Sequence, residues 1–491
     1  MTRKRLILSA VGLLVALLAF PVLFLQYFNW NEHRDRVASW VGTAIQREVQ
    51  ISDRLGFQLW PTTKLSVSGL QISSPEGVSA LPLLNVPSAE VEFAIWPLLS
   101  GILVIDRLEM DSPTLNLVSG LEEGATNWRS RLDEIAIRSL ILRELQVSQA
   151  HIQYSDSDPQ LDRDLHLSQL DWVLPEDVGD GAVTATGTFS GSALEVRGSL
   201  TPGGDDNLEA ALRLVLGKIS GELEGTVTEV MQGGNVDIRL ALETSDLTQS
   251  VTMVMPGLTE QKKELFSGIA RVSAVMRGRP GKDLRLEDID VTTRSERLRI
   301  TASGSISSLV EFFKRPAQGS AVSPTRLKVL AETEELGSLV DLFKGRVPFK
   351  ASAEAQGVLT GSLGDFRIED VVIDASGEHA KLSATGYMDD LLSPHGWSID
   401  FRAKSSTDQL GAFLKSYTQW DLPFIGKGVV LGRVSGTEGD VDVSEIELQL
   451  ESGSMTLNAD GEIGPIGPRA QFNMPFEIDA RDLAALAQPL G

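Results

Sequence analysis

Apolar and polar residues alternate with a period of two along most of the chain after residue 57. In residues 298–309, LRITASGSISSL, the residues Leu298, Ile300, Ala302 and Ile306 fall on one face with Gly304, and polar residues occupy the other face. This alternation predicts β-strands with one apolar side. The same phrase, apolar-x-Ala-x-Gly-x-apolar, recurs as VTATGTF at 183–189, LSATGYM at 382–388 and LNADGEI at 457–463.

The apolar positions of these related strands are the candidate lining of one shared surface. Because side chains at every second position of a strand point the same way, each phrase contributes two to four candidate residues to that surface. The candidates are Val183, Ala185, Leu298, Ile300, Ala302, Ile306, Leu382, Ala384, Met388, Met455, Leu457, Ala459 and Ile463.

A helical period appears in three places. Residues 37–45 carry Val37, Trp40, Val41, Ala44 and Ile45 at helical spacing, which predicts an amphipathic helix packed on the first strands, or alternatively lying on a membrane surface. Shorter helices are predicted later, from Leu336, Leu339, Val340 and Phe343 and from Leu410, Phe413, Leu414 and Tyr417, with Thr333 and Thr407 as N-caps.

The second half of the chain is repetitive. Leu336, Leu410 and Leu483 occupy equivalent places, 74 and 73 residues apart. A period of about 75 residues predicts stacked units, each too small to bury its own apolar face. We therefore divide the chain into seven segments. They are an anchor (1–30), an N-terminal helix and β segment (31–130), a β continuation (131–242), three repeats (243–331, 332–404 and 405–478), and the start of a further repeat or a terminal cap (479–491).

The N-terminal segment predicts a membrane anchor. Arg3, Lys4 and Arg5 precede 23 mostly apolar residues, Leu6–Phe28, enough to cross a bilayer as a helix. The segment is longer than the apolar part of a signal peptide and offers no small-x-small cleavage site. The basic residues orient it with the N-terminus in the cytoplasm, and Tyr27 and Trp30 suit the far interface. The anchor residues include Leu6, Leu13, Leu17, Phe20, Leu25 and Phe28.

Composition argues against several other functions. The net charge of −23 is unfavourable for binding nucleic acid, and the chain has no cysteine. His33, His151, His166, His379 and His395 show no metal-ligand spacing, and the aspartates of YSDSDPQLDRD lack the glycine and glutamate of a calcium loop. We therefore expect no catalytic residue, no metal site and no cofactor, and the protein is predicted not to be an enzyme.

Several phrases near the N-terminus resemble the AsmA family. They are the anchor, FQLWPTTKLSVSGLQI with Trp60-Pro61, VPSAEVEFAIWPLLSGILVIDRLEMDSPTLNL, and GATNW ending in Asn127-Trp128, while the later repeats resemble the C-terminal AsmA-like region. The resemblance implies a mainly β fold with short helices, in which an N-terminal transmembrane helix is followed by an elongated, twisted antiparallel β-sheet groove of stacked repeats.

The resemblance also implies a function. Such proteins are thought to carry phospholipid from the inner towards the outer membrane, so the expected partners are phospholipid acyl chains, the inner membrane and a periplasmic or outer-membrane protein, with no nucleic acid. The apolar residues of each strand agree with this, because a sheet with one greasy face must cover it with another layer or with a greasy ligand. A sheet packed on itself, and a periplasmic scaffold that assists outer-membrane protein assembly, are the alternatives.

Overall fold

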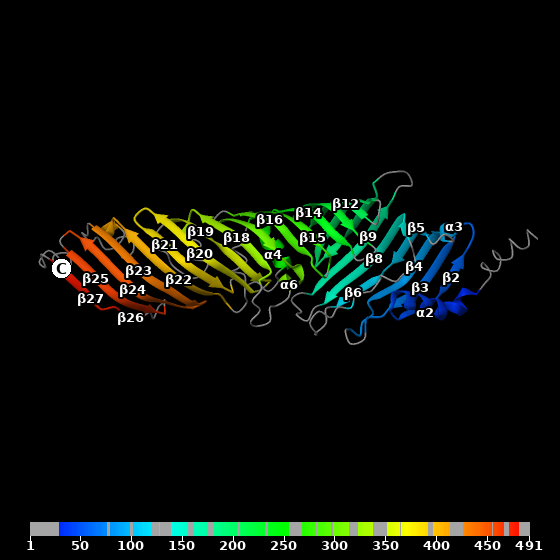
Figure 1. The fold of residues 1–491 in the computed structure, drawn as a ribbon, viewed down its shortest axis with the longest axis horizontal. Helices are drawn as coiled ribbons and strands as arrows, with labels where there is room; N and C mark the ends of the chain where they lie inside the picture. The colour runs from blue at the N-terminus through cyan, green and yellow to red at the C-terminus, as the bar shows by residue number, and fades with distance from the viewer. Residues whose placement is uncertain are drawn as a thin grey trace, which may run out of the picture. The chain divides into compact units, whose positions relative to one another are not determined.

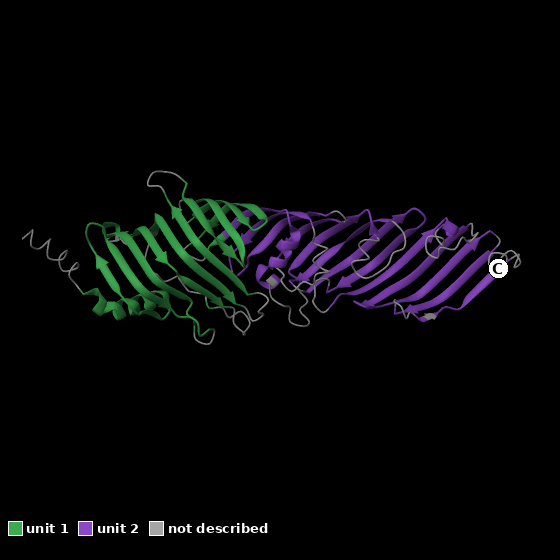
Figure 2. Ribbon diagram, turned by 180° about the vertical axis from the view of Figure 1, so that it is seen from behind, with its two compact units in different colours: residues 1–235 green, residues 236–491 purple. Residues whose placement is uncertain are grey.

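The chain forms two compact units, Met1–Asn235 and Val236–Gly491, and each is described here by itself (Figure 2). The structure is a computed structural model. It describes residues 29–75, 79–98, 102–118, 127, 139–155, 162–174, 180–203, 207–230, 234–254, 268–280, 282–295, 298–313, 323–336, 351–363, 365–390, 396–412, 426–453, 455–465 and 471–480.

The first unit is mainly β (Figure 1). Its helices are η1 (Trp30–His33), α2 (Arg34–Ile45) and α3 (Ile95–Leu98). Its strands are β1 (Val49–Ile51), β2 (Leu55–Gln58), β3 (Lys64–Ile72), β4 (Leu84–Ala94), β5 (Ile102–Asp111), β6 (Thr114–Val118), β7 (Ser139–Leu142), β8 (Glu144–Ser155), β9 (Arg163–Val173), β10 (Ala182–Phe189), β11 (Ser192–Gly203), β12 (Asn207–Leu216) and β13 (Ile219–Thr228).

Strand β3 changes register in its middle, as its sequence KLSVSGLQI indicates. Gly69 has φ +68°, and a Cβ there would come 2.1 Å from the Ser52 Oγ, so glycine is required at this break. The first half of β3 pairs with β2, and the second half pairs with β1. The break therefore keeps apolar residues on one face of both halves.

A fully buried asparagine fixes the one region of parallel pairing described in the first unit. Strands β5 and β6 pair antiparallel with β4 and parallel with β7 and β8, which corrects the expectation of a purely antiparallel sheet. Asn127, from the connection between β6 and β7, is 0% exposed. Its Oδ1 accepts from the Val118 nitrogen at 2.8 Å, and its Nδ2 donates to the Asn116 oxygen at 2.7 Å and to the Ser74 Oγ at 3.0 Å. The side chain thereby holds the crossover that parallel strands need.

Helix α2 packs on the first strands, as expected. Ala38 is buried in a cluster with strand residues that include Val49 and Leu55, and Val37, Val41 and Ile45 pack against it. Trp40 was predicted on the buried face but is 74% exposed, because the apolar stripe of the helix centres on Ala38 rather than on the tryptophan. The helix covers one end of the apolar face of the first unit.

The second unit is a meander of antiparallel strands that pair in chain order from β14 to β25 (Figure 1). Strands β26 and β27 both pair with β25. The strands are β14 (Asn235–Thr244), β15 (Ile269–Gly278), β16 (Arg285–Arg294), β17 (Arg299–Ile306), β18 (Thr325–Thr333), β19 (Ala351–Ser362), β20 (Asp365–Gly377), β21 (Lys381–Asp389), β22 (Ser398–Thr407), β23 (Gly426–Thr437), β24 (Asp440–Ser452), β25 (Met455–Gly464), β26 (Gln471–Asn473) and β27 (Phe476–Ala480), with helices α4 (Leu247–Val254) and α6 (Leu309–Phe313).

Each repeat of the second unit contains the same bulge followed by the same glycine. The bulges lie in β16, β20 and β24, where an acidic residue with φ near +50° interrupts the register: Asp288, Asp370 and Glu445. The first paired residue after each bulge lies opposite the glycine of the recurring phrase, as Val371 does to Gly386. A Cβ on Gly386 would come 2.0 Å from the backbone carbonyl oxygen of Asp400 in the next strand. Each copy of the phrase therefore places a glycine opposite the residue that follows a bulge, where the backbone of the next strand leaves no room for a side chain.

The threonines predicted as N-caps each accept a backbone hydrogen bond just before a helical residue. The Thr407 hydroxyl accepts from the Gln409 nitrogen at 3.0 Å, just before the helical residues that begin at Leu410, and Thr333 makes the same bond to Glu335 at 3.1 Å. Leu410 is only 2% exposed. The predicted helical residues Leu339, Val340, Phe343, Phe413, Leu414 and Tyr417 lie outside the described residues.

The expectation of a mainly β chain with short helices is confirmed, and the sheet of the second unit is antiparallel. In the part of the chain that the structure describes, no helix has both the length and the apolar character needed to cross a bilayer. The predicted anchor, Leu6–Phe28, lies outside that part. The division into seven segments stays a prediction.

Candidate functional site

The second unit carries an uncharged face across all its paired strands, called here the inner face. Register relates its positions from strand to strand, and similar rows recur in successive repeats. They are Val291–Ala302–Val329–Gly357, Ile373–Ala384–Ala403–Gly432 and Leu448–Ala459–Phe476. Among the described strands β14 to β27, every paired position on this face is apolar, glycine, serine or threonine.

Charged residues of these strands lie on the opposite, outer face, where they form ion pairs between neighbouring strands. The Arg433 guanidinium donates to both carboxylate oxygens of Asp400, at 2.8 and 2.6 Å. These hydrogen bonds lower the pKa of Asp400 and raise the pKa of Arg433. Glu287 pairs with Arg285 of its own strand and with Arg277 of β15, and these hydrogen bonds lower the pKa of Glu287. The outer face is therefore stabilised by charge pairs in water, and the inner face by apolar contact.

Part of the inner face is covered by a short helix. Leu309 and Phe312 of α6 pack against a cluster that contains Ala274, Ile289 and Ile306. Another cluster, built on Val371, Ala384 and Phe401, consists of strand residues alone. In this second region the described hydrophobic residues that pack together therefore all come from strands.

The inner face becomes more exposed towards the last strands. Val430 of β23 is 37% exposed, and Phe476 and Ile478 of β27 are 69% and 43% exposed. Their register partners place all three on the inner face. Large apolar side chains with such exposure favour contact with an apolar ligand or partner.

The first unit has a comparable apolar face of its own. Strands β8 to β13 place Leu145, Val147, Leu167, Leu170 and Val183 on one side, in register with apolar residues and glycines of β11 to β13. Trp172 lies on this face, and its indole nitrogen donates to the Leu200 oxygen at 3.0 Å. Each of the two units therefore carries an apolar face of its own.

All the candidate lining residues lie on these inner faces, and none is exposed. Val183, Ala185, Ala384, Ala459 and Ile306 are buried. Leu298, Ile300, Ala302, Leu382, Met388, Met455, Leu457 and Ile463 are partly buried. The neighbouring residues Arg299, Lys381 and Thr456 are exposed on the outer face. Their role as a lipid lining remains a prediction.

The sequence patterns missed several inner-face residues. Phe401, Val329 and Val434 lie in strands that lack the recurring phrase, although their period of two could have revealed them. Ile289, Val371 and Ile446 were missed because the bulge before each one adds a residue and breaks that period.

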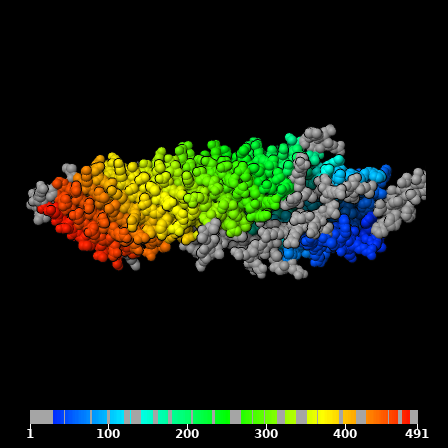
Figure 3. All heavy atoms as spheres, viewed as in Figure 1, coloured from blue at the N-terminus to red at the C-terminus, as the bar shows by residue number. Residues whose placement is uncertain are grey.

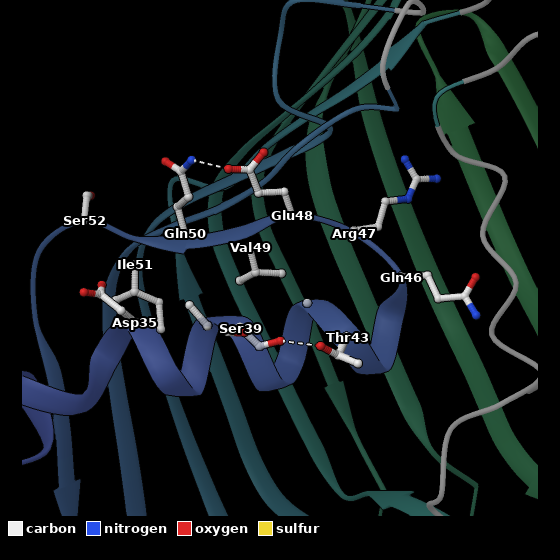
Figure 4. A pocket seen from close by; sticks show the side chains of 12 residues that line it. Asp35, Ser39, Thr43, Gln46, Arg47, Glu48, Val49, Gln50, Ile51 and Ser52 are labelled. Carbon is white, nitrogen blue, oxygen red and sulfur yellow. Dashed lines mark hydrogen bonds between the residues drawn. The ribbon is translucent and has the colours of Figure 1, made fainter.

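A hollow between α2 and β1 differs in chemistry from the inner face. Figure 4 shows Asp35, Ser39, Thr43, Arg47 and Gln50 among the residues around it. The Thr43 hydroxyl donates to the Ser39 oxygen at 2.8 Å, and burial lowers the pKa of Arg47. This polar lining does not suit an acyl chain.

Two histidines that are separated in sequence lie together on the outer face of the first unit. His151 of β8 and His166 of β9 are direct cross-strand partners, and their rings stack with centroids 4.0 Å apart. Asp164 contacts both, through Oδ1 to the His151 Nε2 and through Oδ2 to the His166 Nε2 at 2.9 Å. The spacing of the histidines along the chain gave no sign of this cluster, because the β8–β9 hairpin brings them together.

The surface of the second unit follows its chain order, with neighbouring colours succeeding one another along it (Figure 3).

Comparison with known proteins adds one match. Residues 1–201 match the model of the AsmA family, and this range includes Trp60-Pro61 and Asn127. Searches of curated proteins and of solved structures found no match. The match covers the first 201 of the 491 residues, and it assigns this N-terminal part of the chain to the AsmA family.

Proposed function

We propose that this protein is anchored in the inner membrane by Leu6–Phe28 and that its inner face carries phospholipid acyl chains through the periplasm towards the outer membrane. In this role it supports outer-membrane assembly and homeostasis. The lipid headgroups remain in water while the acyl chains follow the apolar side chains, so no residue acts as a catalyst.

The uncharged inner face carries this proposal. An unpaired charge in an apolar environment costs several kcal/mol, so a single charged position would interrupt a path for acyl chains. The described strands β14 to β27 keep each paired inner position uncharged through three repeats. A scaffold that binds polypeptide through its sheet edges or its acidic exterior has no need of that restriction.

Photo-crosslinking in living cells tests the proposal. A crosslinking amino acid replaces Ile300, Leu382 or Leu457 on the inner face, and the matched controls replace Arg299, Lys381 or Thr456 one position away on the outer face. We expect phospholipid adducts at the first three positions and none at the controls. Absence of lipid adducts at all six, or crosslinks from the inner positions only to the protein's own chain, would indicate a self-packed sheet.

A further inference from the structure

Two tryptophan-proline pairs lie at one edge of the first unit. Trp60-Pro61 lies in the turn between β2 and β3, and Trp96-Pro97 lies in α3 after β4. The Phe93 nitrogen donates to the Thr63 oxygen at 3.1 Å, which joins the turn to the end of β4. The segments 59–63 and 93–97, called here the tryptophan edge, contain no charged residue.

Both tryptophans of this edge point into solvent. Trp60 is 73% exposed and Trp96 is 82% exposed, among the highest values for large apolar side chains in the described residues. Exposing such large apolar side chains to water is unfavourable, whereas the interface of a bilayer accommodates the apolar ring and the polar indole nitrogen together. Two tryptophans on one uncharged edge therefore fit a lipid surface.

An aromatic row connects this edge to the start of the described chain. The rings of Trp30 and Phe57 have centroids 5.0 Å apart, and those of Phe57 and Phe93 are 6.4 Å apart. Trp60 and Trp96 each follow a member of this row by three residues. The chain therefore enters the folded unit beside the tryptophan edge, directly after the 23-residue apolar segment that ends at Phe28.

We propose that the tryptophan edge docks into the interface of the membrane that holds the anchor. This inference rests on the anchor in the proposed function, and it adds which edge of the protein contacts lipid. Phe57 and Phe93 belong to the apolar face of β2 to β4. Docking at this edge would consequently place the beginning of that face against the bilayer, where acyl chains could leave the membrane.

A fluorescence experiment on the full-length protein tests the docking. Because the chain has no cysteine, Thr62→Cys or Ser220→Cys gives a single site for an environment-sensitive fluorophore. Both residues are exposed, and Ser220 lies in β13. The protein is reconstituted in vesicles of phosphatidylethanolamine and phosphatidylglycerol that contain a lipid with a quencher near its headgroup. We expect a blue shift and quenching at Thr62→Cys and neither at Ser220→Cys.

Substitution of the tryptophans identifies the cause. Trp60→Ser with Trp96→Ser should abolish quenching at the Thr62→Cys label, whereas Trp40→Ser, which changes an equally exposed tryptophan on α2, should leave it unchanged. Quenching that survives the double substitution overturns the proposal, and so does a blue shift without quenching, which would show that protein covers the edge. Lipid crosslinking at Ile300 is measured separately, so failure of transport and failure of docking are distinguishable.

Independently, we infer that His151, Asp164 and His166 bind a divalent transition-metal ion. Their ligand atoms all lie within 4.8 Å of one another. Two imidazoles and one carboxylate suit Zn²⁺, whereas Ca²⁺ and Mg²⁺ prefer oxygen ligands alone. The side chains are 26%, 44% and 54% exposed, which leaves room for a water molecule in a fourth position.

Metal titration of the full-length protein tests this site. After treatment with a chelator, the protein is titrated with Co²⁺, whose visible absorption reports tetrahedral coordination, and then with Zn²⁺ in competition. We expect one equivalent to bind, with affinity reduced about tenfold or more in Asp164→Asn and His166→Gln. His379→Gln, which changes an exposed histidine that contacts Gln409, should bind normally. Absence of binding, or equal binding by all variants, would show that the two imidazoles only donate hydrogen bonds to Asp164.

Discussion

Substitution of two adjacent residues of β23 distinguishes an effect on lipid transport from an effect on the stability of the fold. Val430 lies on the inner face and is 37% exposed, while Leu431 lies on the outer face between Lys404 and Glu447 and is 38% exposed. Val430→Asp and Leu431→Asp therefore introduce the same charge at nearly equal burial. Only the first places it on the proposed path of the acyl chains.

The expected magnitudes follow from burial and charge. Each side chain is roughly 60% buried, and full burial of such a side chain contributes about 1.5–3 kcal/mol to stability. The free energy of unfolding of each variant should therefore fall by about 1–2 kcal/mol. An aspartate in contact with hydrocarbon costs about 3 kcal/mol more than an apolar residue, which corresponds to roughly a 150-fold lower occupancy by an acyl chain at that point. Transfer that passes this point should slow by about two orders of magnitude in Val430→Asp and little in Leu431→Asp.

The assay measures transfer of a fluorescent phospholipid between donor and acceptor vesicles by the full-length protein. Urea unfolding of both variants supplies the stability control. Equal transfer rates for Val430→Asp and Leu431→Asp, at equal stability, would refute the assignment of the inner face as the lipid path.

Three further predictions concern the fold. Gly386→Ala should be destabilising because its Cβ would come 2.0 Å from the backbone carbonyl oxygen of Asp400. Gly56→Ala should be nearly neutral because the nearest atom to its Cβ, the Ser66 Cβ, would be 3.9 Å away. Equal midpoints of urea unfolding for the two variants would contradict this prediction. Asn127→Ala should cost about 2–4 kcal/mol by leaving buried partners unsatisfied, and hydrogen exchange across β6 should rise; unchanged exchange would show that the crossover is held otherwise. Arg433 lowers the pKa of Asp400, so the ionised pair stabilises the fold above the unfolded pKa of about 3.9, and this contribution disappears as pH falls through the folded pKa. The stability advantage of the wild type over Asp400→Asn should therefore shrink below about pH 4 in urea titrations, and an advantage that does not change with pH would contradict the pairing.

The period of two was sufficient to predict the strands and the side of each strand that faces inward, because one buried face constrains every second residue. It was insufficient at the bulges. Asp288, Asp370 and Glu445 each add one residue, so a reader of the alternation assigns the following positions to the wrong face. The recurring Ala-x-Gly phrase identified the strand after each bulge without revealing the bulge itself, which depends on pairing with both neighbouring strands.

Features that depend on distant pairing were not predictable from local pattern. The parallel arrangement of β5 and β6 with β8 depends on a connection that includes Asn127, and nothing in the alternation of these strands distinguishes parallel from antiparallel partners. Similarly, His151 and His166 become neighbours only through the register of one hairpin. Trp40 was misplaced because its helical spacing grouped it with Val37 and Val41, whereas the helix packs on the sheet through the small Ala38.

The strand order of the second unit also bears on how the chain acquires its structure. From β14 to β25 consecutive strands pair with each other, so each pairing closes only the connection between two neighbouring strands. A chain that is synthesised from its N-terminus can add these strands one at a time to a growing edge. Synthesis and folding of this unit can thus proceed in the same direction, without waiting for the C-terminal strands.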